Sequence, residues 1–258
     1  DGETLHRTVP PERWGVAIVD LRQLRKVVRS YVVRGKIAPT DRDQFSINDT
    51  TIGPSIYTVV GQLIKPITDQ AGKMSWALML HPGGLECQVF VTHSWAEGVY
   101  EFIDKVLHSW PRGARNAYCC MLSNPQNLDI SELIRSPRDS PFAKALTAST
   151  CMLVVPNHCG SIYSRIWCTY EAFVAYTESK DIFNACAPVP NMMVSIFAVV
   201  LISIMSLSAG FIYSSVNPDW VSNWWTFPQK LNWTAAVFLL VASLIPAGSV
   251  TGILIWIA

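Results

Sequence analysis

Polar side chains follow three short apolar runs in the middle of this chain. The residues concerned are His93, Ser94 and Trp95 after the first run, Asn124 and Gln126 after the second, and Asn157 and His158 after the third. If the runs are parallel strands, their carboxyl ends meet at one edge of the sheet, which is where α/β proteins bind ligands. We therefore expect these side chains to face a common crevice.

A further candidate group lies in the segment SIYSRIWCTYE, residues 161–171. Trp167 and Glu171 are four residues apart and share one face of a helix. A carboxylate beside the crevice can bind ribose hydroxyls and stabilise an oxocarbenium-like transition state as a glycosidic bond breaks. The alternative is a solvated Glu171 in the first two helical turns, stabilised by the helix dipole. We expect this helix to pack on the sheet through Ile166, Tyr170, Phe173 and Val174.

The other polar residues each have a chemical and a structural interpretation. His93 is either a general acid–base, because imidazole titrates near neutral pH, or a residue that closes the crevice by hydrogen bonding. Ser94 is unsuited to a nucleophile pair with His93, because adjacent strand residues point to opposite faces. Trp95 is expected at the crevice with them.

The remaining candidates would bind different parts of a nucleotide. Asn124 and Gln126 suit an amide or a ribose hydroxyl, or they satisfy their own loops. Arg165 suits a phosphate or a nearby carboxylate, and Trp167 suits base stacking or packing.

No metal site is predicted. The seven cysteines include the adjacent pair Cys119 and Cys120, but no CxxC, HxxxH or HExxH spacing occurs. Cys168 is expected to be a buried structural thiol, and the cysteines as a whole are expected to be thiols of a cytosolic domain.

The elements that must position these residues are strands that alternate with helices. The expected strands are Gln88–Thr92, Ala117–Leu122 and Cys151–Val155; the expected helices are Val99–Trp110, Pro141–Ser149 and Ser164–Ser179. This alternation predicts an α/β fold with a parallel sheet, in which residues 88–92 lie between the other two strands or at the switch point. We expect a further short strand in Asp181–Cys186, and we expect residues 15–85 to complete the sheet.

The segment with Ser164, Trp167, Cys168 and Glu171 resembles the Ser…Trp-Cys-x-x-Glu motif of Toll/interleukin-1 receptor-like (TIR) domains. Together with QVFVTHSW, SNPQ and SPFAKAL, it is most similar to a group of TIR-like proteins of algae and other protists. The resemblance covers about Cys87–Ile182. It implies a parallel sheet of the flavodoxin-like or TIR-like kind, and NAD as a substrate rather than a cofactor, with Glu171 as the catalytic residue. Self-association is also implied.

The composition divides the chain. It is 50% hydrophobic and 15% charged, against about 25% charged in ordinary soluble domains. After Ile182 the formal charges are Asp219 and Lys230. Residues 192–213 and 234–258 are each long enough to span a bilayer, so we predict a transmembrane helical hairpin with a Trp-rich interfacial loop.

Three regions follow: an N-terminal extension (1–85), a TIR-like domain (86–186) and a membrane region (187–258). The Trp14–Val33 segment predicts an amphipathic helix whose basic face is either solvated or in contact with anionic lipid. The basic residues upstream of the spans favour a multi-pass protein with its soluble domain in the cytosol. A start without Met and an end inside an apolar run indicate a piece of a longer protein.

Three functions are compatible with this pattern. The first is a membrane-anchored domain that binds and hydrolyses NAD or a related nucleotide. The second is a non-catalytic signalling or scaffolding domain that works by self-association. The third is a cytosolic regulatory domain of a larger membrane protein. A net charge of +1 gives no reason to expect nucleic acid as a partner.

Overall fold

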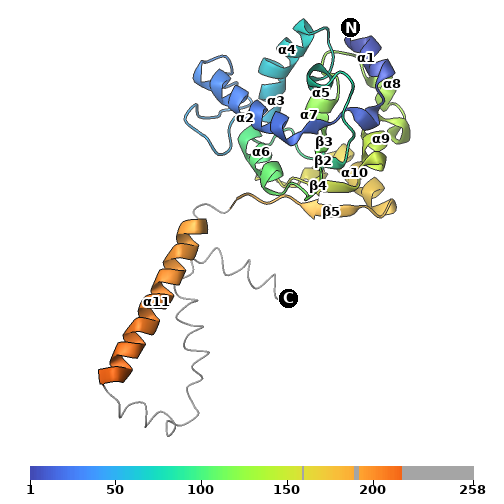
Figure 1. The fold of residues 1–258 in the computed structure, drawn as a ribbon. Coiled ribbons are helices and arrows are strands. Elements are labelled where there is room, and N and C mark those ends of the chain that lie inside the picture. The colour runs from blue at the N-terminus through green and yellow to red at the C-terminus, as the bar shows by residue number, and fades with distance from the viewer. Residues whose placement is uncertain (159, 189–191, 217–258) are drawn as a thin grey trace. The chain divides into compact units, whose positions relative to one another are not determined.

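The computed structural model describes residues 1–158, 160–188 and 192–216. The chain divides into two compact units, Asp1–Val189 and Pro190–Ala258. The first is built on one five-stranded, mostly parallel sheet flanked by helices, so the predicted α/β class is confirmed (Figure 1).

The strand order is β1-β3-β2-β4-β5. The bounds are Val16–Ala17 for β1, Val89–Thr92 for β2, Asn116–Cys119 for β3, Cys151–Val154 for β4 and Asp181–Asn184 for β5. Strands β2 to β5 are parallel, whereas β1 pairs with β3 in the antiparallel direction. Strand β2 therefore lies between β3 and β4, as predicted, and the early segment and the Asp181–Cys186 region each contribute an edge strand.

The second predicted strand is shorter than expected. The ladder between β2 and β3 ends at the Val91–Cys119 pair, and Cys120–Ser123 form a helical turn, α7. The Ser123 hydroxyl oxygen accepts a hydrogen bond from the Cys119 backbone N–H at 3.0 Å, which stabilises the turn. Met121 and Leu122 are buried in the core, so their apolar character reflects packing in a turn rather than in a strand.

Helices cover both faces of the sheet (Figure 1). On one face α2 (Ile18–Val33), α3 (Ile56–Val59) and α6 (Val99–His108) pack against Val89, Val91 and Leu153. On the other, α9 (Pro141–Ala148) and α10 (Ile166–Thr177) pack against Phe90, Met152 and Val154. Residues of the 1–85 and 86–186 segments thus share one hydrophobic core.

The remaining helices are short and lie in the connections. They are α1 (Gly2–Thr8), α4 (Lys65–Gln70), α5 (Trp76–Leu80) and α8 (Ser131–Ile134), and a π-helical stretch, Val60–Ile64, joins α3 to α4.

The basic face of α2 holds a loop. Arg25 forms a two-point ion pair with Asp104 of α6, at 2.6 and 2.7 Å, and donates to the Thr50 carbonyl oxygen at 2.9 Å. Arg29 donates to the Ile47 carbonyl oxygen at 2.6 Å. Half of the predicted basic face is therefore used to fix the 46–53 loop against the domain.

Two glycines allow the early segment to approach α6 closely. At Gly98 an added Cβ would overlap the Ile52 carbonyl group, and at Gly53 it would overlap the Tyr100 ring. Gly53 also has a φ of +75°, which side chains with a Cβ rarely adopt. The two segments therefore meet backbone to backbone at the start of α6.

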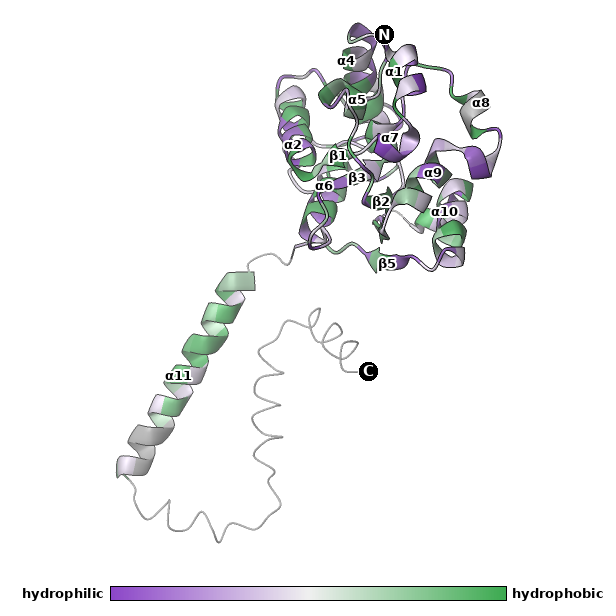
Figure 2. Ribbon diagram, turned by 45° about the vertical axis from the view of Figure 1, so that its right-hand side comes forward, coloured by the Kyte–Doolittle hydropathy of each residue, from purple (hydrophilic) through white to green (hydrophobic). Residues whose placement is uncertain are grey.

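In the second unit the structure describes one helix, α11 (Met192–Val216). Figure 2 shows hydrophobic residues along most of its length. Within the described residues it is the one helix long and apolar enough to cross a membrane, over Met192–Ala209. The second predicted span, 234–258, and its Trp-rich loop lie outside the described residues, so the structure supports one candidate span rather than a hairpin.

The backbone contact at Gly98 gives a stability prediction. Gly98→Ala should lower the free energy of unfolding of residues 1–189 by about 1–3 kcal/mol, because the new methyl group must displace the Ile52 backbone. Gly61→Ala is the control, since an added Cβ there meets nothing within 4 Å in a helical segment. It should leave stability unchanged or raise it by up to about 1 kcal/mol. Denaturant unfolding measures both, and equal effects would contradict the close approach.

Candidate functional site

The strand order reverses beside β2. From β2 the chain proceeds to β3 on one side, and then to β4 on the other. Such a switch point leaves a crevice at the carboxyl ends of the strands, because the flanking helices diverge to opposite faces there. The three predicted strand-end loops converge on this edge.

One cavity of about 120 Å³, which we call the Glu171 cavity, lies at this edge. It brings together seven of the eight predicted site residues. They are His93, Trp95, Asn124, Gln126, Arg165, Trp167 and Glu171. Ser94 is the exception. Its hydroxyl oxygen accepts from the Ala96 N–H at 3.3 Å, which is consistent with the opposite orientation expected from strand alternation.

Glu171 is buried rather than solvated, with 5% of its surface exposed. The Thr92 hydroxyl, at the end of β2, donates to Glu171 Oε2 at 2.6 Å. Burial raises the pKa of Glu171 from 4.5 to about 7, although the Thr92 hydrogen bond and the Arg165 charge both lower it. The carboxyl group is therefore close to half-ionised at neutral pH.

The face predicted for α10 is confirmed for Val174, which packs against the core, but it is wrong for two of the four residues. Ile166 and Phe173 are 77% and 61% exposed, whereas Cys168, Glu171 and Ala175 face the sheet. The buried residues still follow a helical spacing, and the helix is turned so that its carboxylate reaches the Thr92 hydroxyl. The helix therefore buries Glu171 against Thr92 and leaves Ile166 and Phe173 exposed.

His93 is buried and neutral. Burial, together with the Arg165 charge, lowers its pKa to about 3. Its Nε2 lies 3.4 Å from the Cys120 Sγ, which itself accepts from the Trp95 indole N–H at 3.2 Å. Burial raises the pKa of the Cys120 thiol to about 12, so the thiol keeps its proton.

The other ring nitrogen of His93, Nδ1, is buried and has no hydrogen-bond partner among the described residues. A neutral imidazole of this kind suits hydrogen bonding to a ligand rather than acid catalysis near neutral pH, so the general-acid interpretation of His93 is not supported.

Arg165 and Trp167 lie at the start of α10. Arg165 Nη1 contacts the His93 carbonyl oxygen at 3.4 Å, which turns the guanidinium toward the crevice. The Trp167 ring stacks on Phe142, with centroids 5.1 Å apart. Trp167 is therefore both a packing residue and a wall of the cavity.

Asn124 and Gln126 are partly committed to their own loop. The Tyr118 hydroxyl donates to Asn124 Oδ1 at 2.6 Å, and Gln126 Nε2 donates to the Asn124 carbonyl oxygen at 3.1 Å. Among the described residues, Asn124 Nδ2 and Gln126 Oε1 have no partner, so one donor and one acceptor remain for a ligand.

Sequence reasoning missed three contributors to this region. Thr92 binds Glu171, and Cys120 lines the cavity. Thr92 could have been found as the last polar residue of the central strand, whereas Cys120 was hidden in a presumed strand. The third, Glu97, is fully buried; burial raises its pKa to about 8 although Lys105, at 3.5 Å, lowers it.

Glu97 begins a chain of charged contacts on the other side of β2. Lys105 also pairs with Glu101 at 2.7 Å, and Glu101 accepts from His158 Nδ1 at 2.5 Å. His158, predicted at the crevice, thus lies with α6 rather than beside Glu171. Within the described ranges, no three His, Cys, Asp or Glu side chains gather as a metal site would require.

No family model, curated protein or solved structure matches this chain. The contacts around Glu171 are accordingly the basis on which its function must be inferred.

The raised pKa of Glu171 predicts a pH-dependent stability. The native state keeps the proton up to about pH 7, whereas the unfolded chain releases it near 4.5, so this contribution is full below 4.5 and is lost as pH rises through 7. The free energy of unfolding of Glu171→Gln should therefore rise by about 1–3 kcal/mol relative to that of the wild type between pH 4.5 and 8.

Unfolding free energies measured across this range test the assignment. Thr92→Val removes a hydrogen bond that lowers the pKa of Glu171, so the stability of this variant should begin to fall at the same pH as that of the wild type but continue to fall to a higher pH. Parallel pH profiles for the wild type and Glu171→Gln would show that Glu171 ionises normally.

Proposed function

We propose that this chain is a membrane-anchored, TIR-like domain that binds NAD or a related nucleotide and hydrolyses it to nicotinamide and an ADP-ribose product. The observation that carries the proposal is the buried Glu171 carboxyl, which lies in a cavity at the switch point and is bound by Thr92. A buried carboxyl with a strongly raised pKa in such a crevice is a functional-site candidate.

The cavity is of a size for one ring. Its volume of about 120 Å³ is slightly below the roughly 150 Å³ of an apolar protein cavity that holds benzene. Nicotinamide is a single ring with a carboxamide. The polar groups without a partner around it are the Asn124 amide N–H and the Gln126 carbonyl oxygen, and these match an amide that both accepts and donates.

The reaction breaks the bond between the ribose C1′ and the pyridinium nitrogen. The bonding electron pair goes to nitrogen, which leaves as neutral nicotinamide, and positive charge develops on the ribosyl oxocarbenium ion. In its ionised form Glu171 stabilises that charge and binds the ribose hydroxyls. Water then adds to C1′ and loses one proton, for which a carboxylate is an acceptor.

The resemblance to TIR-like domains agrees with this chemistry. The segment with Ser164, Trp167, Cys168 and Glu171 follows β4 and opens α10, which is the position that the resemblance implies. The parallel order β3-β2-β4-β5 is that of a flavodoxin-like sheet. Identity as a TIR-like domain is nevertheless part of the proposal.

Replacement of the carboxylate tests the activity. Glu171→Gln should reduce nicotinamide release from NAD by at least about a hundredfold, because the amide keeps the shape but cannot carry the stabilising charge. Glu178→Gln, at the end of the same helix, is the matched control and should retain activity. The measurement is nicotinamide released by the purified chain concentrated on vesicles. Turnover that persists in Glu171→Gln would assign the reaction to another group.

A non-catalytic, self-associating domain is the second candidate. It is favoured by the outer surface of α10 and β5, where Phe173, Tyr176, Ile182 and Phe183 are 45% exposed or more. This candidate would replace the first if the wild type neither binds NAD by calorimetry nor releases nicotinamide, yet forms oligomers.

Attachment to a membrane rests on α11. We propose that Met192–Ala209 crosses the bilayer, because these 18 residues, which have a mean hydropathy of 2.4, extend about 27 Å as a helix, close to the thickness of the hydrocarbon core. We also propose that the protein crosses the membrane more than once and that residues 1–189 lie in the cytosol.

A flotation experiment tests the anchor. The full chain should float with lipid vesicles and resist extraction at alkaline pH, whereas residues 1–189 should remain in the soluble fraction. Extraction of the full chain at high pH would contradict a spanning α11.

A further inference from the structure

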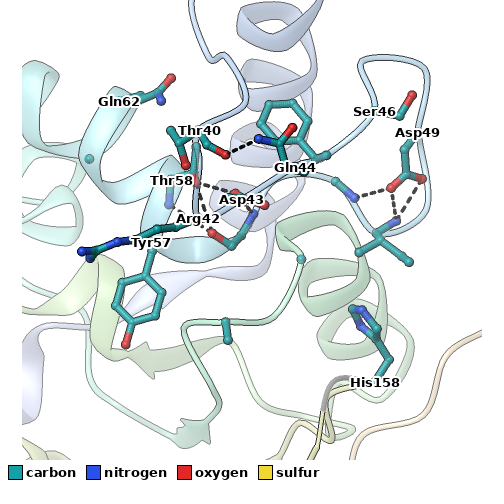
Figure 3. Close-up of a pocket in the computed structure, with 17 residues that line it drawn as sticks. Thr40, Arg42, Asp43, Gln44, Ser46, Asp49, Tyr57, Thr58, Gln62 and His158 are labelled. Carbon is teal, nitrogen blue, oxygen red and sulfur yellow. Dashed lines mark hydrogen bonds between the residues drawn. The ribbon is translucent and has the colours of Figure 1, made fainter.

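The β2–α6 loop, residues 93–98, lines two cavities. His93 and Trp95 line the Glu171 cavity, while Ala96 and Gly98 line a much larger one of about 1170 Å³. The rest of this second cavity is formed by side chains of residues 40–62 and by His158 (Figure 3). We call it the 40–62 groove.

A pair of rings stands where the two cavities adjoin. Tyr57 belongs to the 40–62 groove and Trp95 to the Glu171 cavity, and their ring centroids are 5.4 Å apart. The Tyr57 backbone N–H also donates to the Trp95 carbonyl oxygen at 3.2 Å. Both cavities therefore lie along one loop at the carboxyl edge of the sheet, separated by one aromatic pair.

The groove holds two carboxylates whose oxygens are already occupied. Asp43 accepts from the Ser55 backbone N–H at 2.8 Å and from the Thr58 hydroxyl. Asp49 accepts from the backbone N–H of Thr51 and Gly53, both at 2.8 Å. Burial raises the pKa of Asp49, but these N–H groups outweigh it and hold the pKa at about 2.

Arg42 is the uncommitted charge of the groove. Among the described residues it has no ion-pair or hydrogen-bond partner, and it is exposed. Tyr57 lies in the same groove with 57% of its surface exposed, so one face of an aromatic ring is open. A free guanidinium and an open ring are the groups that bind a phosphate and stack on a base.

The groove is also held in shape before any ligand binds. Arg25 and Arg29 of α2 fix the carbonyl groups of the 46–53 loop, and Gly53 and Gly98 allow that loop to lie directly against the start of α6. A preformed site of this kind spends little binding free energy on ordering its own loops.

We propose that the 40–62 groove binds the adenylate half of a dinucleotide, with Arg42 on its phosphate and Tyr57 against its base. The inference rests on the proposed function, because it explains where the rest of the substrate lies when the Glu171 cavity has room for one ring. The groove exceeds the 300–1,000 Å³ usual for ligand pockets, so a nucleotide fits within it. The dinucleotide passes the Tyr57–Trp95 pair between its two halves.

The experiment uses adenosine monophosphate (AMP) as the probe, with the full chain in detergent. Calorimetry should show AMP binding that weakens at least about tenfold in Arg42→Gln, since a charge-assisted contact to phosphate is lost. Arg34→Gln, an exposed arginine just after α2, is the matched control and should bind AMP as the wild type does. Tyr57→Ala should weaken AMP binding as well.

Competition separates a shared site from an independent nucleotide site. AMP should inhibit nicotinamide release from NAD competitively, and Arg42→Gln should raise the KM for NAD but leave turnover of nicotinamide riboside, which lacks phosphate and adenylate, unchanged. Absence of AMP binding, equal effects of the two arginine variants, or AMP binding without competition would each overturn the inference.

The two proposals fail in different ways. If the wild type binds AMP and Arg42→Gln binds it at least about tenfold more weakly, but no nicotinamide is released, the hydrolase proposal fails and the adenylate site stands. If nicotinamide riboside and NAD are both hydrolysed and Arg42→Gln changes neither reaction, the hydrolase proposal stands and the adenylate site fails.

Discussion

A parallel sheet has two apolar faces, and both must be covered by helices before it is stable in water. In this protein α9 and α10 cover one face, but on the other the segment after β2 provides α6 alone. The first 85 residues complete the cover with α2 and α3, and they add β1 to the sheet edge. The early segment is therefore part of the fold's core, and the 40–62 groove arises from the way it is attached.

Burial of carboxyl groups is the main electrostatic feature of the domain. Glu171 and Glu97 lie near the end of β2, and desolvation raises the pKa of both, to about 7 and about 8. They differ in their partners. Glu171 has the Thr92 hydroxyl and lines a cavity, whereas Glu97 is fully enclosed with the Lys105 ammonium at 3.5 Å. An accessible carboxyl with a tunable proton suits chemistry, and an enclosed one contributes to the local structure.

Short β-branched runs bounded by polar residues were sufficient to predict β2, β4 and the central place of β2. The polar residues that follow these strands then identified most of the lining of the Glu171 cavity, because the carboxyl ends of parallel strands lie at one edge of the sheet. The face of α10 was mispredicted because hydrophobicity favours burying Ile166 and Phe173, while the partner that turns Glu171 inward, Thr92, lies 79 residues away in sequence. The groove was missed because the 40–55 loop has no periodic pattern, and its shape depends on Arg25 and Arg29 reaching across from α2.

The close approaches at Gly53 and Gly98 also bear on how relatives of this chain could be recognised. A Cβ would overlap neighbouring atoms at both positions, and Gly53 also has a positive φ, so glycine is required independently of whichever residues perform chemistry in the cavities. A sequence could exchange Glu171, Arg42 or Tyr57 and keep this architecture, but it could not readily exchange either glycine. The pair therefore forms a fingerprint of shared descent: a glycine before the helix that follows the first central strand, and a second glycine about 45 residues earlier in an upstream loop.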